Sequence, residues 1–284
     1  MAVNFSKTFS SAFRYAFDFN RLLPFFIINL VMVAFIIFFI DSIIDFLPAI
    51  ISSNWAGVSI ANLIYTALAF VIIILITVLL RIYFQAAIAD NARFYWQDKR
   101  KDLTKSFPTG SKYLTVLFAL ILAMIITVLV SGFLGLIHII GPFLSIIVSI
   151  ILSLIFMFLI QIVVISNKGA LDAIKEGYGL FMKNKFDVFI FWLVLNILSI
   201  VILIVAVFPI LIAFISIAAP LLDSLIAQPG SVDGAKLIAD AIPLVKANLL
   251  NLGIASILSA LIFSYLTVFQ ESAKTFFYMQ KKRK

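Results

Sequence analysis

The sequence predicts an all-α, polytopic membrane protein with six transmembrane helices in three pseudo-repeats and cytoplasmic interfacial amphipathic helices. The composition is the first reason, because 64% of the 284 residues are hydrophobic and only 12% are charged, against about a quarter charged in soluble domains. The second is a set of six apolar runs, and the third is the placement of the basic residues around them. We therefore expect one integral membrane domain over residues 1–284.

An amphipathic segment comes before the first apolar run. Four phenylalanines recur at every fourth position of residues 4–21, NFSKTFSSAFRYAFDFNR, namely Phe5, Phe9, Phe13 and Phe17. On a helix these rings share one face, while Lys7, Arg14 and Asp18 fall on the opposite face. This pattern is typical of a helix that lies in the headgroup plane of a membrane. The alternative is that the four rings pack against other helices of the same protein.

Six apolar runs follow, each with few or no charges. They cover roughly residues 22–40, 60–85, 113–133, 141–165, 187–215 and 248–270. A bilayer core of about 30 Å needs about 20 apolar residues of helix. Because the runs are continuous rather than alternating, they indicate helices and not the strands of a transmembrane barrel.

The basic residues indicate how the spans are oriented. With six spans and a cytoplasmic N-terminus, all of the 21 lysines and arginines except Lys236 and Lys246 lie on the cytoplasmic side. Five aspartates lie on the other side, namely Asp41, Asp45, Asp223, Asp233 and Asp240. The positive-inside rule therefore predicts a multi-pass protein of the cell membrane with both termini in the cytoplasm.

The net charge of +8 predicts contact with anionic lipid headgroups on the cytoplasmic side. The closing KKRK could be a nucleic-acid tract, but directly after a span it is better explained as a stop-transfer flank. We therefore expect membrane lipids as partners and no nucleic acid. The chain has no cysteine, which excludes disulfides and thiolate metal sites.

The order of amphipathic helix, basic turn and span recurs along the chain. Residues 167–201 repeat the order of residues 4–36, and residues 91–124 give a weaker copy interrupted by Pro108 and Gly110. One face of the second amphipathic helix is formed by Ala170, Ile174, Tyr178, Phe181 and Met182. We predict repeat units over residues 1–90, 91–166 and 167–284, with Tyr178 and Phe181 at the membrane interface like the four phenylalanines.

Two stretches carry a family resemblance. GALDAIKEGYGLFMKNKFDVF and the closing QESAKTFFYMQKKR resemble the membrane domain that some bacteria fuse to glycerophosphodiester phosphodiesterases, and related, poorly characterised six-span proteins. Glu176 and Gly177 depart from the pattern, because a serine often stands there. The resemblance implies a six-span fold and a membrane location, with no established catalytic residues to carry over, and any link to glycerophospholipid metabolism would be analogy alone.

The sequence offers no evident catalytic constellation. It has no G-x-S-x-G, P-loop, G-x-G-x-x-G or H-E-x-x-H motif, and its single histidine, His138, is expected in a hairpin at the outer surface. We therefore expect no enzyme, no cofactor and no metal site. Four amides within or near the spans are candidates for polar contacts: Asn29, Gln161, Asn196 and Asn251. They would either join helices or line a substrate site.

Two functions of different classes remain open. The first is a membrane scaffold or lipid-organising protein whose amphipathic helices arrange headgroups and neighbouring proteins. The second is a transporter or permease for a small or amphiphilic molecule, with a cavity lined by Asn29, Gln161 and Asn196. The lack of acidic or basic residues deep in the spans disfavours a proton-coupled or ion-coupled mechanism.

Overall fold

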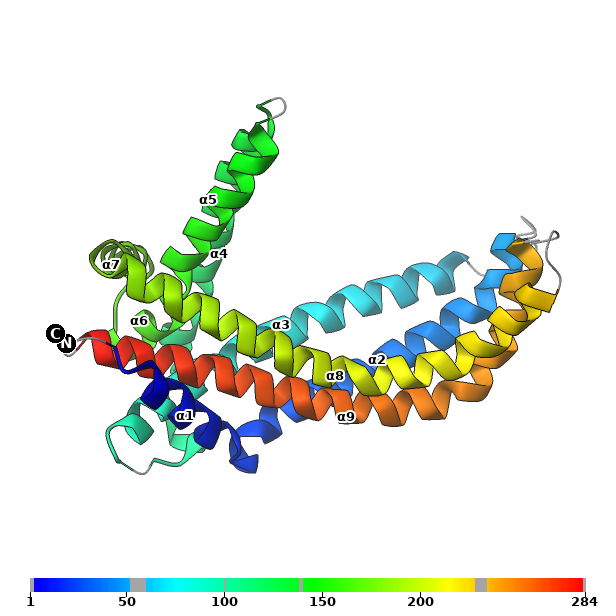
Figure 1. Cartoon of the computed structure of the whole chain (residues 1–284), viewed down its shortest axis with the longest axis horizontal. Helices are drawn as coiled ribbons and strands as arrows, with labels where there is room; N and C mark the ends of the chain where they lie inside the picture. Colours follow the sequence, from blue (N-terminus) through cyan, green and yellow to red (C-terminus); the bar gives the residue numbers. More distant parts are fainter. Residues whose placement is uncertain (1–2, 52–59, 100, 138–139, 228–233, 283–284) are drawn as a thin grey trace. The chain divides into compact units, whose positions relative to one another are not determined.

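The computed structural model describes residues 3–51, 60–99, 101–137, 140–227 and 234–282, and within these ranges the regular elements are helices (Figure 1). In chain order they are α1 (Phe5–Ala16), α2 (Phe19–Ile51), α3 (Ile60–Trp96), the 3-10 helix η1 (Leu103–Ser106), α4 (Gly110–Gly135), α5 (Gly141–Phe156), α6 (Leu159–Ser166), α7 (Ala170–Lys183), α8 (Lys185–Ala227) and α9 (Gly234–Lys282). The predicted all-helical class is confirmed. His138 lies outside the described residues.

Six segments of the described chain are long and apolar enough to cross a membrane. They are Phe19–Ile40, Ile64–Trp96, Gly110–Gly135, Gly141–Ser166, Lys185–Leu222 and Asp240–Lys282. Each overlaps one of the six predicted runs, so the prediction of a multi-pass membrane protein is confirmed at this level.

The fourth predicted span is interrupted between α5 and α6. Phe158, at the interruption, is buried and stacks on Phe191 at 6.0 Å and on Phe277 at 5.4 Å between ring centroids. Residues 159–165 of α6 are all buried. The end of this run is therefore a core element of the protein, although its sequence is as apolar as a lipid-facing span.

The last two helices are much longer than a bilayer requires. α8 has 43 residues and contains Pro209 and Pro220, and α9 has 49 residues and contains Pro243. At about 1.5 Å per residue either helix is roughly twice as long as a hydrocarbon core of about 30 Å. Both helices are therefore longer than a perpendicular crossing of the apolar layer requires, and they carry prolines at positions where helices bend.

The chain forms two compact units. Unit 1 comprises Met1–Leu23, Arg81–Ile200 and Tyr265–Lys284, and unit 2 comprises Pro24–Leu80 and Val201–Ser264. Each unit combines segments from the first and the third predicted repeat units. The compact units thus do not coincide with the repeats, and the three pseudo-repeats stay a prediction.

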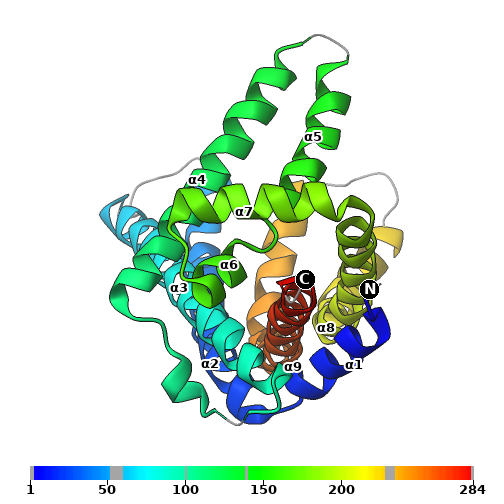
Figure 2. The same ribbon diagram turned by 90° about the vertical axis from the view of Figure 1, so that its left-hand side faces the viewer.

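Unit 1 has an aromatic core. The ring of Phe191 from α8 stacks on Phe277 of α9 at 4.4 Å and on Phe9 of α1 at 5.5 Å, and Phe158 extends the stack. Helix α7 crosses the ends of α4 and α5 (Figure 2). Gly177 permits this crossing, because a Cβ atom there would lie only 2.7 Å from the Ile155 carbonyl oxygen.

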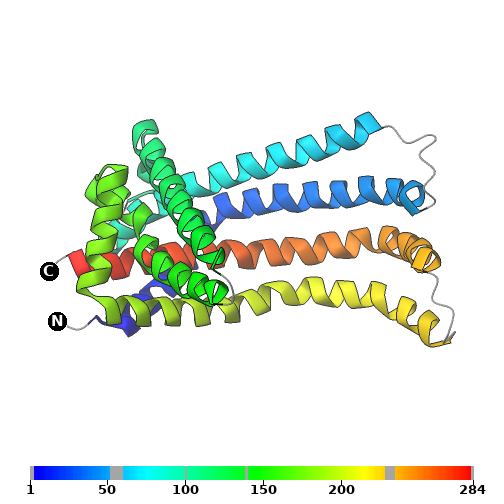
Figure 3. The same cartoon turned by 90° about the horizontal axis from the view of Figure 1, so that it is seen from above.

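Unit 2 is built from segments of α2, α3, α8 and α9 (Figure 3). Phe70 of α3 stacks on Phe39 of α2 at 4.5 Å. The Asn29 side chain of α2 donates from Nδ2 to the Ala260 carbonyl at 3.2 Å and to Ser264 Oγ at 2.9 Å. An aromatic stack and an amide contact thus fix α2 against α3 and α9.

Candidate functional site

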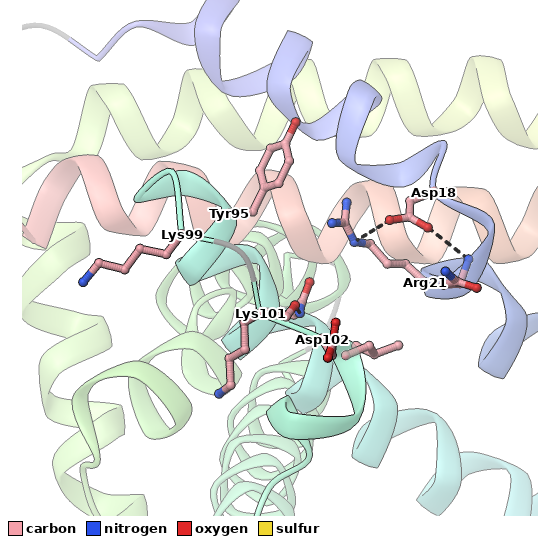
Figure 4. A pocket seen from close by; sticks show the side chains of 9 residues that line it. Asp18, Arg21, Tyr95, Lys99, Lys101 and Asp102 are labelled. Carbon is pink, nitrogen blue, oxygen red and sulfur yellow. Dashed lines mark hydrogen bonds and ion pairs between the residues drawn. The ribbon is translucent and has the colours of Figure 1, made fainter.

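A polar cavity of about 340 Å³ lies in unit 1, where the start of α2 meets the end of α3 and the segment leading into η1 (Figure 4). Nine residues line it: Asp18, Asn20, Arg21, Asn91, Tyr95, Lys99, Lys101, Asp102 and Leu103. The cavity lies at the polar ends of α2 and α3, since charged residues are costly within the apolar parts of such helices.

A buried hydrogen-bond network supports this cavity. The Tyr15 hydroxyl of α1 donates to Asn91 Oδ1 at 2.8 Å, and Asn91 Nδ2 donates to the Lys101 carbonyl at 2.7 Å and to Ser106 Oγ at 3.4 Å. Burial raises the pKa of the Tyr15 hydroxyl well above its ordinary value, so the group remains a protonated donor. The network therefore fixes the segment before η1 against α1 and α3.

The charges around the cavity are largely paired. The guanidinium of Arg21 lies 3.8 Å from the centroid of the Tyr15 ring, and its Nε atom is 3.4 Å from the Asp18 carboxylate. Lys101 Nζ donates to Asp90 at 2.6 Å. Figure 4 shows the Lys99 ammonium pointing away from Arg21. The lining holds three cations and two carboxylates, so most of its charge cancels. It therefore suits a small polar group better than a strong anion.

The lining offers hydrogen-bond donors and acceptors, and no serine, cysteine or histidine is among the nine residues. The part of the chain that the structure describes also holds no group of three or more histidine, aspartate or glutamate side chains that could bind a metal ion.

Gln161 lies in the core of unit 1 and is fully buried. Its Nε2 atom donates to Glu271 Oε2 at 3.0 Å, and Lys274 Nζ donates to Glu271 Oε1 at 2.8 Å. A buried carboxylate needs such partners, because desolvation without them is costly. Gln161 thus joins α6 to α9.

The other three amides have different surroundings. Asn29 makes the interhelical bonds described above, whereas Asn196 donates to the Trp192 carbonyl of its own helix at 2.7 Å. Asn251 likewise donates to Asn248 within α9, at 3.2 Å. Asn196 and Asn251 are exposed.

An apolar cavity of about 370 Å³ lies in unit 2. It is lined by segments of α2, α8 and α9: Asn29, Met32, Val33, Ile36, Ile37, Ile40, Ile210, Leu249, Leu252, Ser256, Ser259, Ala260 and Phe263. Asn29 is thus in the lining of this cavity. Gln161 and Asn196 belong to unit 1 and are not among these residues.

The four phenylalanines of α1 differ in their surroundings. Phe9 is only 8% exposed and belongs to the aromatic core, which corrects its prediction as a membrane-interface residue. Phe5 and Phe13 are half-buried, with Phe277 at 6.3 Å from Phe5 and Phe269 at 4.5 Å from Phe13. Phe17 is 74% exposed. Interface positions for Phe5, Phe13 and Phe17 stay a prediction.

Helix α7 packs against the protein through small residues. Ala170, Ala173 and Gly177 are its buried positions. Tyr178 is 51% exposed, Leu171 is 63% exposed, and Met182 is exposed as well. Phe181, the second predicted interface residue of this helix, is half-buried. The larger apolar side chains of α7 thus form an exposed stripe beside the small-residue contact.

The sequence reasoning missed the small residues that define these contacts. Thr8, Ala12 and Ala16 are buried on α1, as the alanines and the glycine are on α7. Small residues spaced three or four apart allow close helix packing, so this spacing was the signal available in the sequence. Tyr15 and Asn91 were also missed, because a single tyrosine or asparagine gives no pattern.

No protein-family model, curated protein or solved structure matches this chain.

Proposed function

We propose that this protein interacts with and organises membrane lipids, rather than catalysing a reaction, and that helix α7 lies at the membrane surface. The proposal follows from the exposed stripe of Leu171, Tyr178 and Met182. Large apolar side chains that are exposed on the protein surface are typical of an interfacial helix.

The position of α7 beside a span supports this assignment. Leu114 and Phe118 on α4 are 64% and 55% exposed, and they line one recess of about 470 Å³ together with Leu171 of α7. α4 is long and apolar enough to span a bilayer. The exposed apolar surface of this candidate span therefore continues onto α7.

The proposed partners are anionic headgroups on the cytoplasmic side of the cell membrane, with both termini in the cytoplasm. This orientation is supported by the distribution of lysines and arginines. The exposed side of α7 carries Lys175 near its apolar stripe, and a basic residue near an anionic surface contributes about 1 kcal/mol of attraction. The resemblance to six-span membrane domains is consistent with this proposal but adds no chemistry to it.

The absence of cysteine makes the test direct, because a single introduced cysteine carries the only label. Leu171→Cys and Tyr178→Cys would each be coupled to a fluorophore and reconstituted in vesicles that contain lipids spin-labelled along the acyl chain. We expect strong quenching at both positions, whereas the matched control Asp172→Cys on the same helix should be quenched mainly by aqueous iodide. If positions 171 and 172 responded alike, α7 would not lie at the interface.

The apolar cavity of unit 2 supports a second candidate function, transport of an amphiphilic molecule. Its aliphatic lining with Asn29 and Ser256 suits an acyl chain next to a polar group. Vesicles with a fluorescent phosphatidylcholine would report transfer between leaflets through reduction by external dithionite. Transport requires faster transfer in the presence of the protein, and Ser256→Phe, which fills the cavity, should abolish it. Equal rates with and without protein would exclude this function for such lipids.

A further inference from the structure

We propose that a recess at the junction of α7, α8 and α9 binds a phosphate group, and that an anionic phospholipid headgroup supplies it. The recess has a volume of about 470 Å³ and belongs entirely to unit 1. Its lining comprises Glu176, Gly179, Leu180, Lys183, Asn184, Tyr278, Lys281 and Lys282. The lipid source rests on the proposed function, because it requires α7 to lie at the membrane surface.

The floor of the recess is fixed by buried polar groups. Tyr278 is 1% exposed and its hydroxyl donates to Glu176 Oε1 at 2.6 Å. Lys281 is 7% exposed, and its ammonium is held by Asp187 and by Asn184 Oδ1. These side chains cannot move freely, so they give the recess a defined shape and keep the Lys281 charge within it.

The rim carries two cations, Lys183 and Lys282, that no carboxylate of the described residues holds. Lys282 Nζ donates to Ser166 Oγ at 2.8 Å, and Ser166 and the Tyr278 hydroxyl lie 2.6 Å apart. The Lys183 ammonium has no hydrogen bond or ion pair to the part of the chain that the structure describes. Both lysines are exposed. Two exposed ammonium groups on a fixed recess can donate hydrogen bonds to a phosphate.

Helix α7 places the site at the depth of a lipid headgroup. Lys183 is the last residue of α7 and directly follows Met182 of the exposed apolar stripe. If this stripe is sunk into the acyl boundary, the ammonium of the next residue reaches the phosphate layer, as lysines at membrane surfaces do.

The test is native mass spectrometry of the delipidated full chain with added phosphatidylglycerol. We expect Lys183→Gln combined with Lys282→Gln to weaken the first lipid-binding step about tenfold, because two charge-assisted contacts are lost. The control, Lys105→Gln combined with Lys168→Gln, removes the same charge at exposed positions outside the lining. The pair Lys183→Arg and Lys282→Arg should retain binding.

Three outcomes would overturn the proposal or part of it. Equal losses in the glutamine pair and in the control pair would show that only the overall charge matters, which refutes the site. Competition by millimolar inorganic phosphate that matches the lipid in affinity would keep a phosphate site but refute its lipid source. Unchanged binding in the glutamine pair refutes the site as well.

The proposed function can be judged separately in the same variants. Quenching of the label at position 171 reports whether α7 lies at the interface, with or without Lys183 and Lys282. Retained quenching with unaltered lipid affinity in the glutamine pair would refute the phosphate site alone. Loss of quenching in the chain with both lysines would refute the interfacial position.

Discussion

Helices α1 and α7 have the same predicted design but are used differently in the structure. Each is short, amphipathic and followed by a basic residue and a span. α1 buries Phe9 and Tyr15 together with its small residues, whereas α7 buries only Ala170, Ala173 and Gly177. The large apolar side chains are therefore partly core residues on α1 and mainly exposed residues on α7.

The difference shows what an amphipathic pattern does and does not specify. The pattern identifies an apolar face, but an aromatic core and an acyl layer are both apolar, so either can cover that face. The size of the buried residues is more informative. Small residues mark the contact with neighbouring helices on both α1 and α7, since only they allow such close approach.

The largest effect expected from this comparison is at Phe9. Phe9→Ala should lower the free energy of unfolding by about 3 kcal/mol or more, because it leaves a cavity in the aromatic core of unit 1. Phe17→Ala on the same face, at a position 74% exposed, should cost less than about 0.5 kcal/mol. Denaturant unfolding in micelles, followed by tryptophan fluorescence, measures both. Similar losses would mean that the four phenylalanines act alike.

Gly177 tests the close approach of α7. Gly177→Ala should destabilise the protein by about 1–2 kcal/mol, because the new Cβ would lie 2.7 Å from the Ile155 carbonyl oxygen and the helix would have to shift. Gly179→Ala is the matched control, with nothing within 4 Å of its Cβ position. There alanine should stabilise the helix by up to about 1 kcal/mol. Opposite signs in thermal unfolding would confirm the contact, and equal signs would contradict it.

Tyr15 tests whether α1 is also held by its polar network. Tyr15→Phe should cost about 1–2 kcal/mol, because Asn91 Oδ1 would lose its buried donor. Tyr95→Phe, at a more exposed ring that lines the polar cavity, should change the free energy of unfolding by less than about 0.5 kcal/mol. The same unfolding measurement compares the two. A neutral Tyr15→Phe variant would show that this hydrogen bond does not stabilise the fold.

The smallest effect on stability is expected for the exposed stripe of α7. Leu171→Ser should change the free energy of unfolding in micelles by less than about 0.5 kcal/mol, because the side chain is 63% exposed. In vesicles, the same change should reduce acyl-chain quenching of a label at position 178. A loss of more than about 2 kcal/mol in micelles would mean that protein, rather than lipid, covers Leu171.

The sequence by itself determined the helical class and the six apolar segments. A bilayer offers no hydrogen bonds to the backbone, so long uncharged runs must form helices, and their number can be counted directly. The same reasoning found α1 and α7 as amphipathic helices. It also selected Asn29 and Gln161 as polar groups that need partners.

Only the tertiary structure decided which apolar surface faces protein. Residues 159–165 are as hydrophobic as a lipid-facing span, yet all are buried. Gln161 contacts Glu271, which lies 110 residues away in the chain. Lys183 and Lys282 likewise meet in one recess although they end different helices. Hydrophobicity measures transfer out of water and is nearly the same for lipid and for a protein core, so contacts between distant segments had to make that choice.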